Sequence, residues 1–166
     1  MLIRSLTLTL TLFVLCFSAV PMTAQQAAIA LSKTTIESGT PVEITADSLA
    51  VAQETGQALF EGNAKAAQGP IRLNADKVTV DYNQSANQIE KITAVGGVYF
   101  TNGVEVVEGD RAVYQPTQGI VAITGNVLLV QGPNTIAGDH LDLNLTTSAG
   151  TMTGNVKTIF TPTASE

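Results

Sequence analysis

Four aspartates recur along the chain in one local setting, each after a small residue and before alternating apolar positions. They are Asp47, Asp76, Asp110 and Asp139, and successive members lie 29, 34 and 29 positions apart. Carboxylates can hold a metal ion or act as a general acid and base. A regular spacing instead puts them at equivalent points of a repeated unit, where a short carboxylate can accept hydrogen bonds from unpaired backbone N–H groups. We interpret all four as structural, and we expect no metal and no cofactor.

The single histidine, His140, follows the fourth of these aspartates. By strand parity it points away from Leu141 and Leu143, so we expect it on the surface. Ser, His and Asp form no recognisable nucleophilic arrangement, and the sequence lacks the paired carboxylates that a glycan hydrolase needs in a cleft. The Gly-Asn pairs are not phosphate loops, because no helix follows them. We expect no catalytic residue and no enzymatic activity.

Strands are the elements that would position these residues. The apolar residues are mostly Val, Ile, Leu and Ala beside many Thr and Gly, and aromatic residues make up only 5 % of the chain. This composition favours strands, and we find no convincing helix after the N-terminal segment. In "IRLNADKVTV" the apolar parity changes between Leu73 and Val78, so the inward face reverses at Ala75-Asp76. The same reversal occurs at the other three aspartates.

A second marker recurs between the aspartates. The pairs Gly62-Asn63, Gly96-Gly97, Gly125-Asn126 and Gly154-Asn155 follow an aspartate by 15, 20, 15 and 15 positions. Apolar parity is kept across each glycine. A glycine permits a bend, whereas an extra residue reverses parity, so we expect a smooth bend at each glycine and a bulge at each aspartate. The sequence therefore predicts an all-β fold, an elongated antiparallel jelly roll built from four units of about 29 residues.

Apolar residues that share the glycine's parity would line the space between the two facing sheets. Filling the core and contacting acyl chains remain equal alternatives for most of them. Small residues such as Ala58, Ala64 and Ala94 would leave a slot, in which each buried CH2 group is worth roughly 0.8 kcal/mol. The candidate lining residues are Phe60, Ile92, Val98, Phe100, Val121, Ile123, Val127 and Leu129. The candidate rim residues for phosphates or acidic sugars are Lys65, Arg72, Lys77 and Arg111, although any one of them is more often a plain surface charge.

The N-terminus has the features of an export signal. Arg4 precedes an apolar run over residues 6–20, and we expect cleavage after Ala24. A retained anchor is the alternative, although 15 apolar residues are short for a span of about 20. Cys16 lies inside this run, so the mature chain would have no cysteine. We expect a signal peptide over 1–24, a flexible segment over 25–41, the roll over 42–161 and a short tail over 162–166. The net charge of −6 argues against nucleic-acid binding.

The repeated markers carry a resemblance. The stretches "VEITADSLAV", "ALFEGNAKAAQGPIRLNADKVTVDY", "VEGDRAVY" and "AITGNVLLVQGPNTIAGDHLDL" resemble the OstA-like family, most closely its LptA-like periplasmic members. The resemblance implies a V-shaped β-jelly roll that binds lipopolysaccharide in the periplasm and shields the acyl chains of lipid A. It further implies a bridge from the inner to the outer membrane, with LptC-like and LptD-like proteins of the same roll as partners.

The two ends of such a roll lack a capping signal. The first strand region, residues 42–51, and the last, residues 155–161, carry few charges, so we expect head-to-tail self-association by strand addition. Two alternatives stay open. One is a structural β-repeat scaffold of the envelope that binds no lipid, and the other is an LptC-like anchored component of the same pathway. Co-purified lipid A would separate the scaffold from the transport protein.

Overall fold

The computed structural model describes residues 27–33, 37, 39–83, 85 and 88–161. This part of the chain forms eleven strands, and no helix in it is long and apolar enough to span a bilayer. The strands are β1 (Ala27–Ala30), β2 (Glu43–Thr45), β3 (Ser48–Ala52), β4 (Gln57–Gln68), β5 (Ile71–Asn83), β6 (Gln88–Thr101), β7 (Val106–Gln115), β8 (Ile120–Gln131), β9 (Asn134–Asn144), β10 (Ala149–Thr153) and β11 (Lys157–Ile159).

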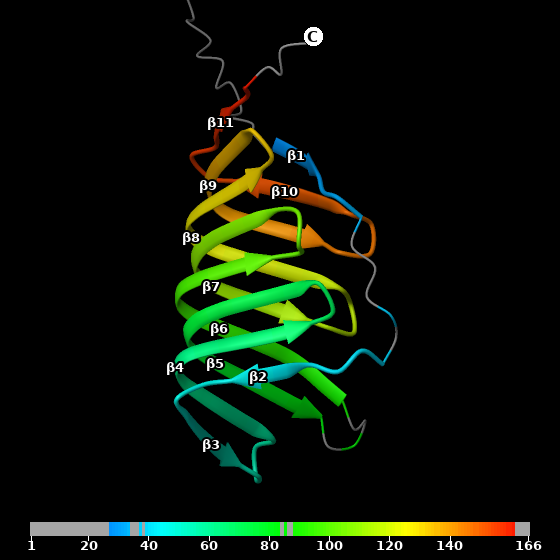
Figure 1. The fold of residues 1–166 in the computed structure, drawn as a ribbon, viewed down its shortest axis with the longest axis vertical. Coiled ribbons are helices and arrows are strands. Elements are labelled where there is room, and N and C mark those ends of the chain that lie inside the picture. The colour runs from blue at the N-terminus through cyan, green and yellow to red at the C-terminus, as the bar shows by residue number, and fades with distance from the viewer. Residues whose placement is uncertain (1–26, 34–36, 38, 84, 86–87, 162–166) are drawn as a thin grey trace, which may run out of the picture.

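Consecutive long strands pair antiparallel from one end of the molecule to the other. The sheet order is β1-β10-β9-β8-β7-β6-β5-β4-β2, with β3 on β4 and β11 on β9. Each strand from β4 to β9 bends near its middle and so contributes to both walls of the roll. Figure 1 shows these strands as stacked arches, with β3 at one end of the long axis and β11 at the other. The predicted all-β jelly roll is confirmed.

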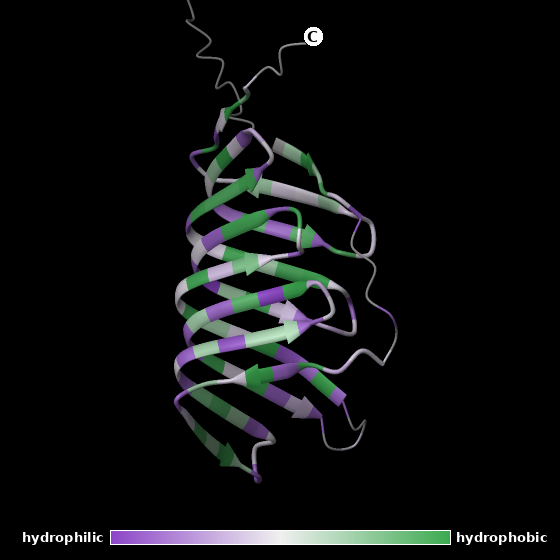
Figure 2. Ribbon diagram, in the orientation of Figure 1, coloured by the Kyte–Doolittle hydropathy of each residue, from purple (hydrophilic) through white to green (hydrophobic). Residues whose placement is uncertain are grey.

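The alternation of buried and exposed residues follows the predicted parity. In β5, Leu73 and Ala75 are buried before the corner, Val78 and Val80 are buried after it, and Asp76 is exposed. In β8, burial stays on one parity across Gly125. Figure 2 shows the result as alternating hydrophilic and hydrophobic bands along the strands. The reversal at the aspartate and the continuity at the glycine are both found.

The register places the two markers at one corner and corrects the position of the bulge. Between β4 and β5, the two residues Gly62 and Asn63 lie opposite the single residue Asp76. Gly62 and Asn63 have φ angles of 80° and 48°, in the left-handed region. The extra residue therefore belongs to the Gly-Asn strand. From parity we had expected it in the aspartate strand, and that prediction was wrong. Glycine and asparagine are the residues that adopt this conformation most readily.

Each aspartate packs on the glycine of the next strand. A Cβ at Gly125 would overlap the Asp110 carboxylate, and the other three corners are built alike. Asn126 Nδ2 donates to Asp110 Oδ2 over 2.9 Å, and equivalent bonds of 2.8 Å and 2.7 Å join the first and fourth corners. Among the described hydrogen bonds, the donor to these carboxylates is a side-chain amide, not the backbone N–H that we expected. The structural interpretation of the aspartates still holds.

The roll begins before the position that we expected. We assigned residues 25–41 to a flexible segment, but Ala27–Ala30 form β1 and pair antiparallel with β10. Leu31 N donates to Ser148 O over 2.8 Å and continues this pairing. The predicted signal peptide and the predicted C-terminal tail lie outside the described residues.

The second corner differs from the others and gives a test of the corner geometry. It carries Gly97 where the others carry asparagine, with a φ of 51° and nothing within 4 Å of an added Cβ. We predict that Gly97→Asn raises the free energy of unfolding by about 0.5–1.5 kcal/mol, because the new amide can reach Asp76 and the unfolded chain loses entropy. Urea denaturation measures the change.

The control is the same substitution in an Asp76→Ala background. In that background the increase in the free energy of unfolding should fall to the contribution from the lower entropy of the unfolded chain. A double-mutant cycle then isolates the interaction between the two side chains. An unchanged gain would show that the amide does not bind the carboxylate.

Candidate lipid-binding site

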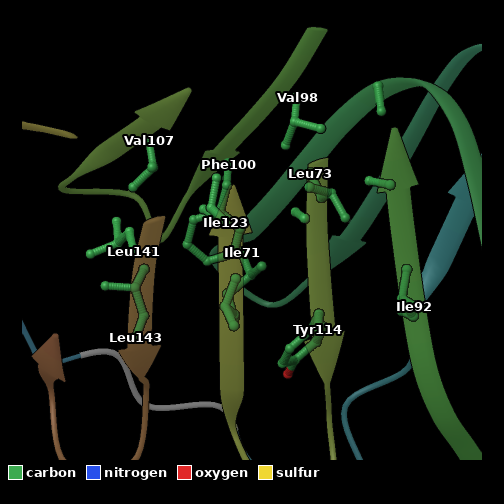
Figure 3. Close-up of a cluster of buried hydrophobic side chains, with 14 of the residues drawn as sticks. Ile71, Leu73, Ile92, Val98, Phe100, Val107, Tyr114, Ile123, Leu141 and Leu143 are labelled. Atoms are coloured by element: carbon green, nitrogen blue, oxygen red, sulfur yellow. The ribbon is translucent and has the colours of Figure 1, made fainter. Parts of the chain in front are cut away.

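The predicted lining residues converge on the interior of the roll. Seven of the eight are buried, with exposed fractions of at most 3 %, and Phe60 is half-buried near the β3 end. Figure 3 shows part of this interior, where Phe100 of β6 lies beside Ile123 of β8. The buried seven are Ile92, Val98, Phe100, Val121, Ile123, Val127 and Leu129.

The middle of the roll is packed shut. A cavity of about 10 Å³, the size of one water molecule, lies among residues that include Leu73, Ile92 and Phe100. Ala64 and Ala94 are fully buried, so the walls close on these small residues and the expected slot is not open here. Tyr114 joins the walls, because its hydroxyl donates to Gln68 Oε1 over 3.0 Å. Burial raises the pKa of Tyr114.

The interior opens at the β3 end. A groove of about 430 Å³ lies there, within the size range of small-molecule sites. Of the predicted residues only Phe60 lines it, whereas sequence reasoning did not assign Tyr82 or Ile89 to a site. Val80 and Tyr82 continue the parity of Val78, and this was the available signal. The apolar lining residues are Val42, Ile44, Val51, Ala52, Ala58, Phe60, Val80, Tyr82 and Ile89.

The predicted rim residues occupy separate places on the outer surface. Lys77 pairs with Glu61 over 3.0 Å, and Arg72 donates to the carbonyl oxygens of Gly69 and Ile71. Lys65 and Arg111 are exposed. The structure therefore does not gather these four side chains into one cationic site.

A different polar cluster borders the groove. Gln57, a lining residue, donates to Asp81 Oδ1 over 2.8 Å, and Lys91 Nζ lies 2.8 Å from Asp81 Oδ2. The hydrogen bond from Lys91 holds the pKa of Asp81 below its ordinary value. His140 is partly exposed and contacts Asp142 over 2.9 Å, which agrees with a surface role.

An apolar roll open at one end agrees with what the chain is similar to. Residues 43–149 match the family described as LptA/(LptD N-terminal domain) LPS transport protein. The chain belongs to this family. The description of this family names transport of LPS.

Two individual proteins are also similar to this chain. An uncharacterized protein from Rhizobium meliloti (strain 1021) is 26 % identical over 115 residues, which cover 64 % of this chain and 62 % of the relative. The chain thus spans less than two thirds of that relative's length. The crystal structure of LptH from Pseudomonas aeruginosa, described as the LptA homologous periplasmic component of the lipopolysaccharide transport device, superposes with a TM-score of 0.66 at 20 % identity. The superposition covers 74 % of this chain and 96 % of LptH, and it confirms the fold.

In this family member the N-terminal segment crosses the side of the roll where the hairpin turns lie. Ser32 N donates to Glu105 Oε1 over 2.7 Å, and Gln131 Nε2 donates to Ala30 O over 2.7 Å. Farther along, Gln68 Nε2 donates to Thr40 O over 3.1 Å. Three turns of successive hairpins, after β4, β6 and β8, therefore hold the segment in place.

Glu105 is the charged centre of this attachment. Its side chain is 2 % exposed and accepts hydrogen bonds from Ser32, Gln131 and, over 2.6 Å, Asn102 Nδ2. Burial is the largest single influence and raises the pKa of Glu105, but these hydrogen bonds together outweigh it, so the pKa lies below its ordinary value. A buried carboxylate with satisfied acceptors is stable only while its donors remain in place.

This arrangement predicts a specific pH dependence. A folded-state pKa below the unfolded one means that Glu105 stabilises the fold at neutral pH, and that this stability is lost as the pH falls through the folded-state pKa. We predict that Glu105→Gln lowers the free energy of unfolding by about 1–3 kcal/mol at pH 7. The difference from the wild type should narrow below pH 4, measured by urea denaturation at both pH values. A difference that stays constant with pH would contradict the assignment.

Proposed function

We propose that this chain binds lipopolysaccharide in the periplasm and carries it toward the outer membrane. The acyl chains of lipid A lie against the apolar interior of the roll, and the sugars and phosphates stay in water. The observation that carries the proposal is the groove at the β3 end, whose lining continues directly into the buried interior through Phe60, Val80 and Ile44. A hydrocarbon chain placed there gains roughly 0.8 kcal/mol per buried CH2 group without any directional contact.

Because the middle of the roll is closely packed, transport through it requires a change in the arrangement of the two walls. For acyl chains to pass Val98 and Val127, the two walls must separate on the side opposite the Asp/Gly corners. The corners join the walls through continuous backbone, whereas the hairpin-turn side is held by side-chain hydrogen bonds and the N-terminal segment. Opening on that side exposes apolar surface, and the acyl chains replace it as they enter.

The ends of the roll support assembly into a bridge. At one end Leu49 and Val51 of β3 are 57 % and 63 % exposed, and at the other Ile159 and Phe160 are 53 % and 73 % exposed. Unpaired strand edges with apolar side chains add further strands. Copies of this chain would therefore join head to tail, and LptC-like and LptD-like proteins with the same roll would join at the inner and outer membrane. A contact of this kind does not close on itself and gives open rods.

One observation favours the scaffold alternative. The middle of the roll is as closely packed as a core with no ligand to hold, and its cavity has room for one water molecule. An LptC-like anchored component of the same pathway would use the same roll, so it differs from our proposal in location and not in chemistry.

Photo-crosslinking separates lipid transport from a scaffold role. A photoreactive residue at Phe60, whose side chain lines the groove, should capture lipopolysaccharide in cells, whereas one at the exposed neighbour Glu61 should not. The same contrast should hold deeper in the roll between Val127, which is buried, and Leu128, which points outward. Mass spectrometry of the crosslinked product identifies the lipid.

The possible outcomes have distinct meanings. Capture at Phe60 and Val127 supports passage through the whole roll. Capture at Phe60 alone would confine the lipid to the groove and contradict the passage. Equal capture at inward and outward positions, or none at any of them, would contradict the proposal.

A further inference from the structure

The first two strands lie near opposite ends of the molecule although they are neighbours in the sequence. β1 pairs with β10 beside the C-terminal end, and β2 pairs with β4 near the other end. Figure 1 shows the two separated along the long axis. The chain therefore travels along much of the roll between Leu31 and Val42. The described contacts of this connection include those of Ser32 with Glu105 and of Thr40 with Gln68.

Backbone pairing and the buried side chain of Ile29 hold β1 on β10. Ile29 is 5 % exposed and lies opposite Gly150, where a Cβ would come within 3.7 Å of the Ile29 Cβ. A larger residue at position 150 would also meet Leu143. The glycine thus makes room for Leu143, and Ile29 lies at an ordinary contact distance beside it. β1 occupies the backbone edge of β10 completely over Ala149–Met152.

This pairing changes the expectation that neither end of the roll is capped. At the C-terminal end, one wall presents the short strand β11, but the other presents β10 already covered by β1. A strand from another molecule can reach β10 only after β1 leaves it.

We infer that β1 is an exchangeable strand, which pairs with β10 of its own chain in a single molecule and with β10 of the preceding copy in an assembled rod. The inference rests on the proposed head-to-tail assembly. In such a rod the β2 end of one copy meets the β10 end of the next, so β1, which immediately precedes β2 in the chain, is carried to its neighbour's β10. Residues 31–42 can span roughly 40 Å when extended.

Pairing of β1 between two molecules is favoured over pairing within one molecule only at high protein concentration. Ile29 lies opposite Gly150 within one chain or between two, so the strand contacts are retained, as in domain swapping. The intramolecular pairing has the advantage of an effective concentration in the millimolar range. Contact between the exposed apolar residues of the two ends, Val51 on one copy and Phe160 on the other, offsets that advantage. β1 therefore caps the single molecule and links the assembled one.

A disulfide between two copies tests the exchange directly. Because Leu31 and Ser148 form a hydrogen-bonded pair, the adjacent pair Ala30 and Ala149 is non-hydrogen-bonded, with side chains close enough for a disulfide. Both residues are exposed. The full chain with Cys16→Ser is prepared as two variants, one carrying Ala30→Cys and the other Ala149→Cys, so that neither can close a disulfide within itself at this pair.

The mixed variants should form a disulfide-linked dimer that increases with protein concentration. A mixture of Ala30→Cys with Thr153→Cys keeps the strand but breaks the register, and it should give only background crosslinking. A level equal to that background at the highest concentration reached would overturn the inference, whether or not the wild type forms rods.

Pinning the strand within one chain gives the reciprocal test. With Ala30→Cys and Ala149→Cys in the same chain, oxidation should hold the protein as a monomer in sedimentation, and reduction should restore concentration-dependent oligomers. Oligomers of equal size in both states would overturn the inference. Lipopolysaccharide capture at Phe60 is measured on the pinned monomer, so a failure of lipid binding is distinguished from a failure of strand exchange.

Discussion

The structure depends on how a long strand carries an apolar face around a corner. Between β4 and β5, β6 and β7, and β8 and β9, two residues of the glycine strand lie opposite one aspartate. The positive φ angles of Gly125 and Asn126 turn the chain without moving its apolar side chains outward. The neighbouring strand reverses parity at its aspartate and so keeps its own apolar residues inside. The Asp110 carboxylate, packed on Gly125 and bonded to Asn126, fixes the two strands to each other. Repetition of this corner produces a roll with two walls.

The same construction sets a conflict between stability and transport. A lining of Val, Ile and Leu that can hold acyl chains also packs against itself, and in the middle of the roll it does so with exposed fractions near zero. The corners are held by backbone pairing, and the opposite side is held by Glu105, Gln68 and Gln131, whose hydrogen bonds can break without disrupting a strand. The groove at the β3 end is where the walls are already apart. Under the proposed function, a lipid that enters there would meet progressively tighter packing, so its movement along the roll would require a local and reversible opening.

Much of this fold could be predicted from the sequence, because parity is a local property. The change of parity between Leu73 and Val78 and its retention across Gly125 placed the interior correctly in β5 and β8. After the first corner the same parity was wrong, because Leu49 and Val51 lie at the open end of the roll and are exposed. The corner bonds could not be predicted, since nothing local says that Asn126 meets Asp110 on another strand. β1 was missed because four residues, "AAIA", give no periodic signal, and their pairing partner β10 lies far away in the sequence. The groove depends on where the walls separate, which is a tertiary property that parity at Tyr82 and Ile89 cannot express.

The central claim is that the groove and interior hold lipid A, and co-purification tests it most directly. Tyr82 and Val95 are both 40 % exposed, but only Tyr82 lines the groove. We predict that wild-type protein purified from the periplasm carries lipid A detectable by mass spectrometry, that Tyr82→Asp removes most of it, and that Val95→Asp leaves it unchanged. Wild-type protein free of lipid A, or an equal loss in both variants, would contradict the account.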